Sequence, residues 1–131
     1  MKKLILIAIC FISLQLSAQG NLQFNQVLTP SFTGSISAQS TSSLGTLTVP
    51  AGKVWKIESG SGVSISNNFF GDVQTARFML DDFTVIGHKT NPVSYPIWLN
   101  EGTYNIYVTH STSNTASYKW GLSIIEFNVV P

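Results

Sequence analysis

The carboxyl groups are the first candidates for chemistry, because the chain contains only six of them. Glycoside hydrolysis requires two carboxyl groups that face each other across a sugar bond. Asp81 and Asp82 are adjacent and, together with Asp72, could supply oxygen ligands to a calcium ion. The same pair is typical of a tight turn between strands, and both interpretations stay open. The spacing in the sequence gives no reason to place any two carboxylates of the following set side by side: Glu58, Asp72, Glu101 and Glu126.

Two histidines and one serine are the other groups that could act in catalysis. His88 and His110 are isolated and lie beside expected loops, so we expect solvated side chains rather than metal ligands, which must converge. Ser123 follows Gly121 but lacks the second glycine of the Gly-x-Ser-x-Gly nucleophile turn. Only a cleft that gathered the three aspartates with His88 would indicate an enzyme. We therefore expect a protein without catalytic residues, metal or cofactor.

Aromatic side chains are the remaining candidates for binding. Successive residues of a strand point to opposite faces, so Trp98 and Tyr107 lie opposite their aliphatic neighbours. If those neighbours face the core, both rings face outward, where they can stack on sugars or contact another subunit. The alternative is that they cover a second sheet. Phe69 and Phe70 are adjacent and cannot both be core residues of one strand, so they are binding candidates too.

The amino terminus has the pattern of a secretory signal peptide. Lys2 and Lys3 precede a mostly apolar run, residues 4–16, and Ser17 and Ala18 follow it. This run is shorter than the roughly 20 residues that span a bilayer; an uncleaved anchor is the alternative. We expect cleavage after Ala18 and export to the cell surface or the medium, with the periplasm as the other destination.

The mature chain that this cleavage would leave is nearly neutral and free of cysteine. Cys10 lies inside the leader and lacks the small-residue pattern of a lipoprotein, so a hydrophobic core must replace disulfides. Loss of Lys2 and Lys3 leaves five basic against six acidic residues. We expect no nucleic-acid partner and no stable membrane insertion after cleavage, because no basic patch remains.

Alternating apolar residues and turn signals predict strands throughout the rest of the chain. Trp55 and Trp120 are expected in the core. Eight or nine short strands favour an all-β fold, an antiparallel β-sandwich that is a jelly roll rather than an immunoglobulin-type domain. Residues 59–62 are expected to form a loop. Strands are expected at 21–28, 46–49, 54–58, 63–66, 76–80, 83–86, 93–99, 103–109 and 118–130.

Three further features of the pattern yield predictions about organisation. In 118–130 the apolar residues change from even to odd positions, which predicts a change of buried face near Gly121. The segments 49–54 and 99–104 share a glycine at equivalent places, as two corners of a Greek key or as two ordinary turns. We divide the chain into a signal peptide (1–18), an amino-terminal strand and Ser/Thr-rich arm (19–44) and a sandwich core (45–131). The arm either stays in its own chain as an edge or flexible connection, or pairs with a neighbouring subunit.

Three segments carry a resemblance to known proteins: VPAGKVWKI (49–57), PIWLNEGTY (96–104) and SIIEFNVVP (123–131). The chain resembles small exported bacterial β-sandwich proteins that have VPAGKxWKI and PxWLxxGT segments. It is more loosely similar to the jelly rolls of tumour-necrosis-factor-like heads and of trimeric fibre tips. The resemblance implies a fold and self-association, and no catalytic residue.

Two functions from different classes follow. The first is an exported, non-enzymatic subunit that forms homo-oligomers in an extracellular or cell-surface structure, as a neutral hydroxyl-rich surface and the missing catalytic groups favour. The alternative is a secreted carbohydrate-binding module with a glycan partner, which would use Trp98 and Tyr107.

Overall fold

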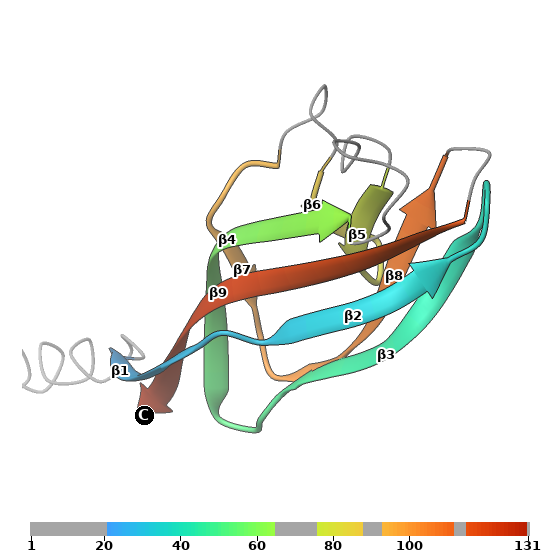
Figure 1. Ribbon diagram of the computed structural model, residues 1–131. Helices are drawn as coiled ribbons and strands as arrows, with labels where there is room; N and C mark the ends of the chain where they lie inside the picture. Colours follow the sequence, from blue (N-terminus) through green and yellow to red (C-terminus); the bar gives the residue numbers. More distant parts are fainter. Residues whose placement is uncertain (1–20, 65–75, 88–92, 112–114, 131) are drawn as a thin grey trace, which may run out of the picture.

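The computed structural model describes residues 21–64, 76–87, 93–111 and 115–130. These residues form two antiparallel sheets packed face to face (Figure 1). The five-stranded sheet has the order β1-β9-β4-β7, with β2 also paired to β9, and the four-stranded sheet has the order β3-β8-β5-β6. The strands of the described residues are β1 (Asn21–Leu28), β2 (Ser31–Ile36), β3 (Thr41–Val49), β4 (Lys53–Ser64), β5 (Ala76–Leu80), β6 (Phe83–Ile86), β7 (Ile97–Leu99), β8 (Gly102–His110) and β9 (Ala116–Val130). The predicted all-β sandwich is confirmed.

The connectivity of the strands is that of a jelly roll. β1 and β2 pair with successive parts of β9, β1 with residues 124–130 and β2 with residues 116–121. When β1 and β2 are counted as strand 1 and the remaining strands are renumbered from 2 to 8 in chain order, the strand orders of the two sheets are 1-8-3-6 and 2-7-4-5. Two Greek keys wound into a double sheet have this order. In the part of the chain that the structure describes, no helix is long and apolar enough to cross a membrane.

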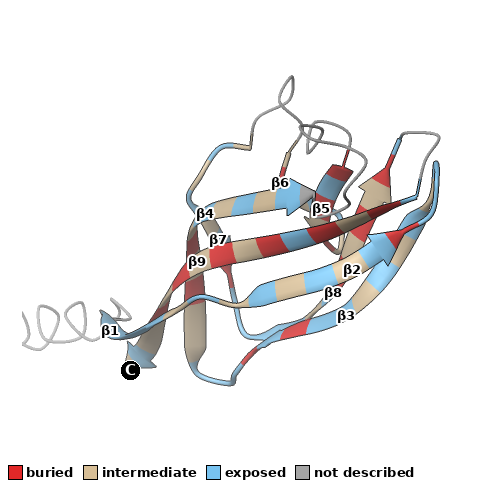
Figure 2. Cartoon of the chain, viewed as in Figure 1, coloured by how far each residue is buried: buried red, intermediate tan, exposed pale blue. Residues whose placement is uncertain are grey.

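The core lies between the sheets and is built from alternate residues of each strand, which appear as alternating bands along β9 in Figure 2. Trp55 and Trp120, predicted as core residues, are both buried. Tyr118 stacks on Trp120 with 5.4 Å between ring centroids. Phe78 reaches Trp120 from the opposite sheet at 5.7 Å. This aromatic cluster joins the two layers at one end of the sandwich.

Residues 59–62, predicted as a loop, belong instead to the long strand β4. Their glycines are there for space rather than for a turn. A Cβ on Gly60 would lie 2.7 Å from the hydroxyl of Tyr95, and one on Gly62 would lie 2.4 Å from the ring of Trp120. Both distances are far below normal contact, so the large inward side chains occupy the volume that side chains at these two positions would fill.

The predicted change of buried face in β9 is wrong. Inward and outward positions alternate without a break from Ala116 to Glu126, and Gly121 is an ordinary outward position. What changes along the strand is polarity. Beyond Ile124 the inward positions become polar, whereas the outward positions become apolar: Ile125, Phe127 and Val129.

The two similar glycine segments are equivalent corners, as one of the two interpretations predicted. One joins β3 to β4 and the other joins β7 to β8, and each carries the chain from one sheet to the other. Gly52 (φ 69°) and Gly102 (φ 149°) adopt positive φ angles that glycine tolerates best. The Gly52 amide donates a 2.8 Å hydrogen bond to Oε2 of Glu101, so the corners also contact each other.

The boundary expected at residue 44 lies inside β3. Ile36 is fully buried and Leu44 packs against the core, so residues 31–44 form part of the sandwich. The first strand differs from them. Every residue from Leu22 to Val27 is exposed, although β1 pairs with β9 of its own chain.

Candidate functional site

The two aromatic residues predicted to face outward lie on different faces of the molecule. Trp98, on β7 of the five-stranded sheet, is 49% exposed, which confirms its predicted orientation. Tyr107, on β8 of the four-stranded sheet, is half-buried between Ser43 and Met79 on neighbouring strands. The structure therefore does not bring Trp98 and Tyr107 together. Phe69 and Phe70 lie outside the described residues.

The carboxylates and histidines do not assemble a reactive centre in the described ranges. Oδ1 of Asp81 accepts hydrogen bonds from the backbone and side-chain nitrogens of Asn105, at 2.9 and 2.8 Å. With φ at 47°, Asp81 has the geometry of a turn residue. No group of three His, Cys, Asp or Glu side chains within these ranges could hold a metal ion. Asp72 and His88 lie outside them.

The expectation of a solvated His110 is wrong. His110 is the last residue of β8 and occupies an inward position opposite the buried Ala76. Its ring packs edge-on against Tyr118, with 5.5 Å between centroids. His110 is therefore part of the core at this end of the sandwich.

The most unusual surface is an apolar area on the outer face of the five-stranded sheet, which we call the outer strip. It contains outward residues of four adjacent strands that meet in register across the sheet. Val27 pairs with Ile125, and Phe24 pairs with Phe127. The residues of the outer strip are Leu22, Phe24 and Val27 of β1, Ile125, Phe127 and Val129 of β9, Val54 of β4 and Trp98 of β7.

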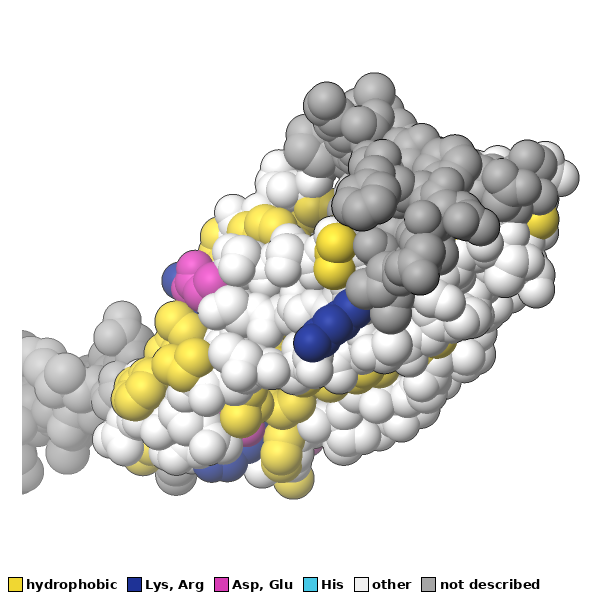
Figure 3. Space-filling model, in the orientation of Figure 1, with side chains coloured by type: hydrophobic (Ala, Val, Ile, Leu, Met, Phe, Trp, Pro, Cys, Tyr) yellow, Lys and Arg dark blue, Asp and Glu magenta, His cyan; other side chains and the backbone are white. Residues whose placement is uncertain are grey.

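The outer strip is as large as the largest apolar patches that monomers usually expose. Phe24 is 63% exposed, Val27 57%, and Leu22, Val129 and Trp98 between 44% and 49%. With aromatic side chains of roughly 150–250 Å² each, these fractions amount to on the order of 500 Å² of apolar surface. Monomers rarely expose more, and patches of this size often bind a partner. In Figure 3, hydrophobic side chains gather at the end of the molecule where Figure 1 marks the carboxyl terminus.

One edge of the outer strip carries a charged pair. Lys56 lies opposite Trp98 on the neighbouring strand, and its Nζ is 5.6 Å from the centre of the indole ring. The same Nζ is 2.5 Å from Oε1 of Glu58. The Trp98 ring also packs on Phe127, with centroids 5.8 Å apart. A half-exposed indole is therefore held in place by an aromatic ring on one side and a cation on another.

Beneath the outer strip, the inward face of the same strands is polar. Glu126 is 3% exposed, and Oε2 accepts a 2.7 Å hydrogen bond from the Trp55 indole. Oε1 accepts hydrogen bonds from Asn25 at 2.5 Å and Gln26 at 3.0 Å, at the bulge of β1. Nζ of Lys53 lies 4.0 Å from Oε1. Burial alone would raise the pKa of Glu126, but these hydrogen bonds and the positive charge together lower it.

This carboxylate, which we call the Glu126 clamp together with its partners, fastens β1 to the rest of the sheet. Its ligands come from β1 (Asn25 and Gln26) and β4 (Trp55 and Lys53), while Glu126 itself lies on β9. All three strands that carry most of the outer strip are thereby joined from below. The clamp is a structural feature, because its oxygens are already occupied by partners of the same chain.

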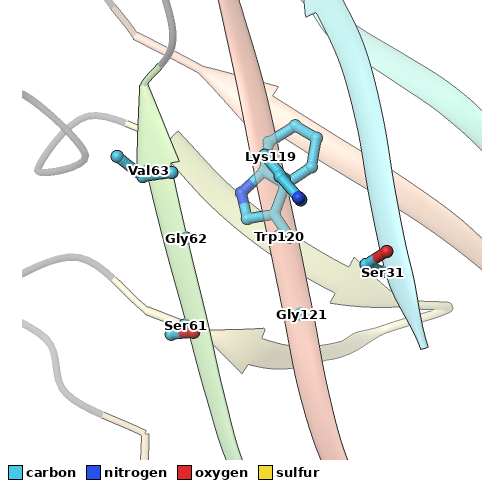
Figure 4. Close-up of a pocket in the computed structure, with 7 residues that line it drawn as sticks. All are labelled: Ser31, Ser61, Gly62, Val63, Lys119, Trp120 and Gly121. Carbon is cyan, nitrogen blue, oxygen red and sulfur yellow. The ribbon is translucent and has the colours of Figure 1, made fainter. Parts of the chain in front are cut away.

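The other half of the outer face is hydroxyl-rich. It contains a hollow of about 390 Å³ where β2, β9 and β4 run side by side (Figure 4). Two glycines without side chains form its floor, and serine hydroxyls and one lysine stand around it. The hollow is lined by Ser31, Ser61, Gly62, Val63, Lys119, Trp120 and Gly121. These residues include no acid–base pair that could perform a reaction.

Comparisons of this chain with protein-family models, with curated proteins and with solved structures found no match. The candidate site therefore rests on geometry. Of the outer strip, sequence reasoning identified only Trp98. The signal for the rest was visible in the odd-numbered apolar residues from Ile125 to Val129, but it was interpreted as a turn of the strand toward the core.

Proposed function

We propose that the protein is an exported, non-enzymatic β-sandwich subunit that self-associates through the outer strip into an extracellular or cell-surface structure. The observation that carries this proposal is the exchange of polarity at one end of the sheet. There, apolar side chains face away from the chain's own core, while Glu126 and its polar partners face inward. Apolar surface of this extent is stabilised when another surface covers it.

The size of the outer strip is consistent with a contact between two copies. Burial of on the order of 500 Å² from each copy would contribute roughly 25 kcal/mol before the costs of association, at about 25 cal/mol per Å². Those costs are about 4–15 kcal/mol for lost motion, and more for ordering side chains. Standard interfaces bury about 800 Å² per partner. The outer strip would therefore form the apolar centre of the interface, and the residues around it would form the polar rim.

Two matched valines offer a sharp test. Val27, in the outer strip, is 57% exposed, and Val63, in the hydroxyl-rich half of the same face, is 51% exposed. We expect secreted wild-type protein to elute as an oligomer in size-exclusion chromatography with light scattering. Val27→Asp should give monomers, because it places a charge in the contact, whereas Val63→Asp should leave the mass unchanged.

Other outcomes of this test are equally informative. A wild-type protein that stays monomeric up to millimolar concentration refutes the proposal. Equal effects of the two substitutions would show that the contact does not involve the outer strip. Circular dichroism on each variant confirms that the fold is retained.

A carbohydrate-binding module is the second candidate, and the setting of Trp98 favours it. Exposed indole rings stack on sugar faces, and Lys56, which is paired with Glu58, lies next to the ring, where its ammonium group can bond to hydroxyl groups. Tyr107 cannot join such a site from the opposite sheet. Binding on a glycan array that is lost in Trp98→Ala and kept in Tyr107→Ala would support this function, and no binding to any glycan would refute it.

A further inference from the structure

One edge of the five-stranded sheet is formed by β1 and β2 in succession, each of which pairs with β9 alone among the described strands. An edge strand presents a row of backbone donors and acceptors that another strand can bind. The opposite edge, β7, has only three residues and follows the cis proline Pro96. β1 is eight residues long, so it offers an added strand more backbone donors and acceptors than β7 does.

The composition of β1 lacks the devices that usually protect such an edge. Natural edge strands are blunted by charged residues, by proline, by short length or by β-bulges. The segment NLQFNQVL contains no charged residue and no proline. Its one irregularity, the bulge between Phe24 and Gln26, lies where the Glu126 clamp holds the strand, so Asn21–Phe24 remains a regular run.

The Glu126 clamp also indicates how β1 is used. Asn25 and Gln26 both donate to Oε1 of Glu126, which fixes β1 on its own β9. A strand fastened in this way offers its outer edge to a partner instead of leaving its chain. The surface that best matches this edge is an identical edge, because two equal strands related by a two-fold axis pair in antiparallel orientation.

We propose that β1 pairs edge to edge, in antiparallel orientation, with β1 of a second copy of this chain. The two five-stranded sheets then become one continuous sheet. Leu22 and Phe24 of both copies meet across the joint, and the two outer strips form one apolar surface. This inference rests on the proposed self-association and adds an edge contact to the contact through the outer strips, because edge pairing places the two outer strips side by side without covering them.

Cysteine scanning of β1 tests the arrangement, because the mature chain is expected to contain no cysteine of its own. Single cysteines replace Leu22, Gln23 and Phe24 in turn, and Thr48, exposed on the other sheet, serves as the control. After mild oxidation, covalent dimers are measured on non-reducing gels. Gln23 is the decisive position, because it pairs with Asn128 and its side chain lies on the face opposite to the outer strip.

Edge pairing predicts covalent dimer from Gln23→Cys, with one position of the scan near the two-fold axis reacting best and Thr48→Cys remaining monomeric. Stacking of the outer strips without edge pairing predicts dimer from Leu22→Cys and Phe24→Cys but none from Gln23→Cys. That result would overturn edge pairing and leave self-association intact. Monomers in light scattering for wild type and all variants would instead refute self-association itself.

Discussion

Among the charged residues that the structure describes, Glu126 is the one whose neutralisation, by substitution with glutamine, should destabilise the protein most. Glutamine keeps one acceptor oxygen but loses the negative charge that binds Trp55 at 2.7 Å and Asn25 at 2.5 Å. The amide nitrogen of glutamine is itself a donor, so it would face the N–H donors that now bind Glu126 and could not accept their hydrogen bonds. Hydrogen bonds to charged groups contribute about 1.5–3 kcal/mol, and breaking a buried charged network costs about 3–5 kcal/mol. We expect Glu126→Gln to lower the free energy of unfolding by about 2–4 kcal/mol.

The pH dependence gives this prediction a second readout. The pKa of Glu126 is lowered from its ordinary value of 4.5, because the folded state favours the carboxylate. A group with a lowered pKa stabilises the fold above its unfolded pKa, and this contribution disappears as the pH falls through the folded value. The difference in the free energy of unfolding between wild type and Glu126→Gln should therefore be largest at pH 7 and should decrease progressively as the pH falls below 4.5.

Urea unfolding followed by tryptophan fluorescence, at pH 7 and at steps down to pH 3, measures both effects. Glu58→Gln is the matched control. Glu58 forms a solvent-accessible ion pair with Lys56; the side chain of Glu58 is 36% exposed and that of Lys56 is 26% exposed. Such pairs contribute about 0–1 kcal/mol to stability. The reasoning fails if Glu126→Gln unfolds at the same urea concentration as wild type, or if the difference in the free energy of unfolding is constant from pH 7 to 3.

Two further substitutions test the packing of β4 and the turn between β5 and β6. Gly62→Ala should destabilise by about 1–3 kcal/mol in thermal unfolding, because its Cβ would lie 2.4 Å from the Trp120 ring. An equal cost of Gly62→Ala in wild type and in a Trp120→Phe background would contradict this cause. Asp81→Ala should cost about 1–2 kcal/mol through loss of both hydrogen bonds from Asn105, and a variant as stable as wild type would show that the turn forms without them.

The fold was predictable where local pattern and tertiary structure agree. The turns at Pro50-Ala51-Gly52 and Asp81-Asp82 have turn chemistry that does not depend on distant residues. The equivalent corners at Gly52 and Gly102 follow from the same logic, because both require positive φ angles. Their mutual contact through Glu101 could not be foreseen, since it joins residues 49 positions apart.

The errors occurred where a residue serves a distant partner. Gly60 and Gly62 read as loop residues in the sequence, although they make space for Tyr95 and Trp120 from other strands. His110 reads as a loop residue because it ends a strand, and its burial depends on the packing of Tyr118. Local sequence contains no information about these partners.

For the apolar outward residues of β9, the local pattern was interpreted correctly but the surface that they face was not. Their odd positions were read correctly as one face of a strand, but the rule that apolar residues face the core of their own chain assigned that face to the interior. The rule presumes a monomer. Where a strand contributes to two apolar layers, one inside the sandwich and one on its surface, a change of parity marks the second layer rather than a bend.

The outer face of the four-stranded sheet completes the argument for an oriented subunit. Its outward residues are hydroxyl-rich, as in the exposed pair Thr48 and Thr103, whose hydroxyls are 3.2 Å apart. Asp81 and Asn105 bond to each other at the same face. A surface that satisfies its own polar groups and remains in water needs no cover, whereas the outer strip does. Under the proposed assembly, the four-stranded sheets would thus face solvent and the five-stranded sheets would meet, so the two layers of one sandwich serve different purposes.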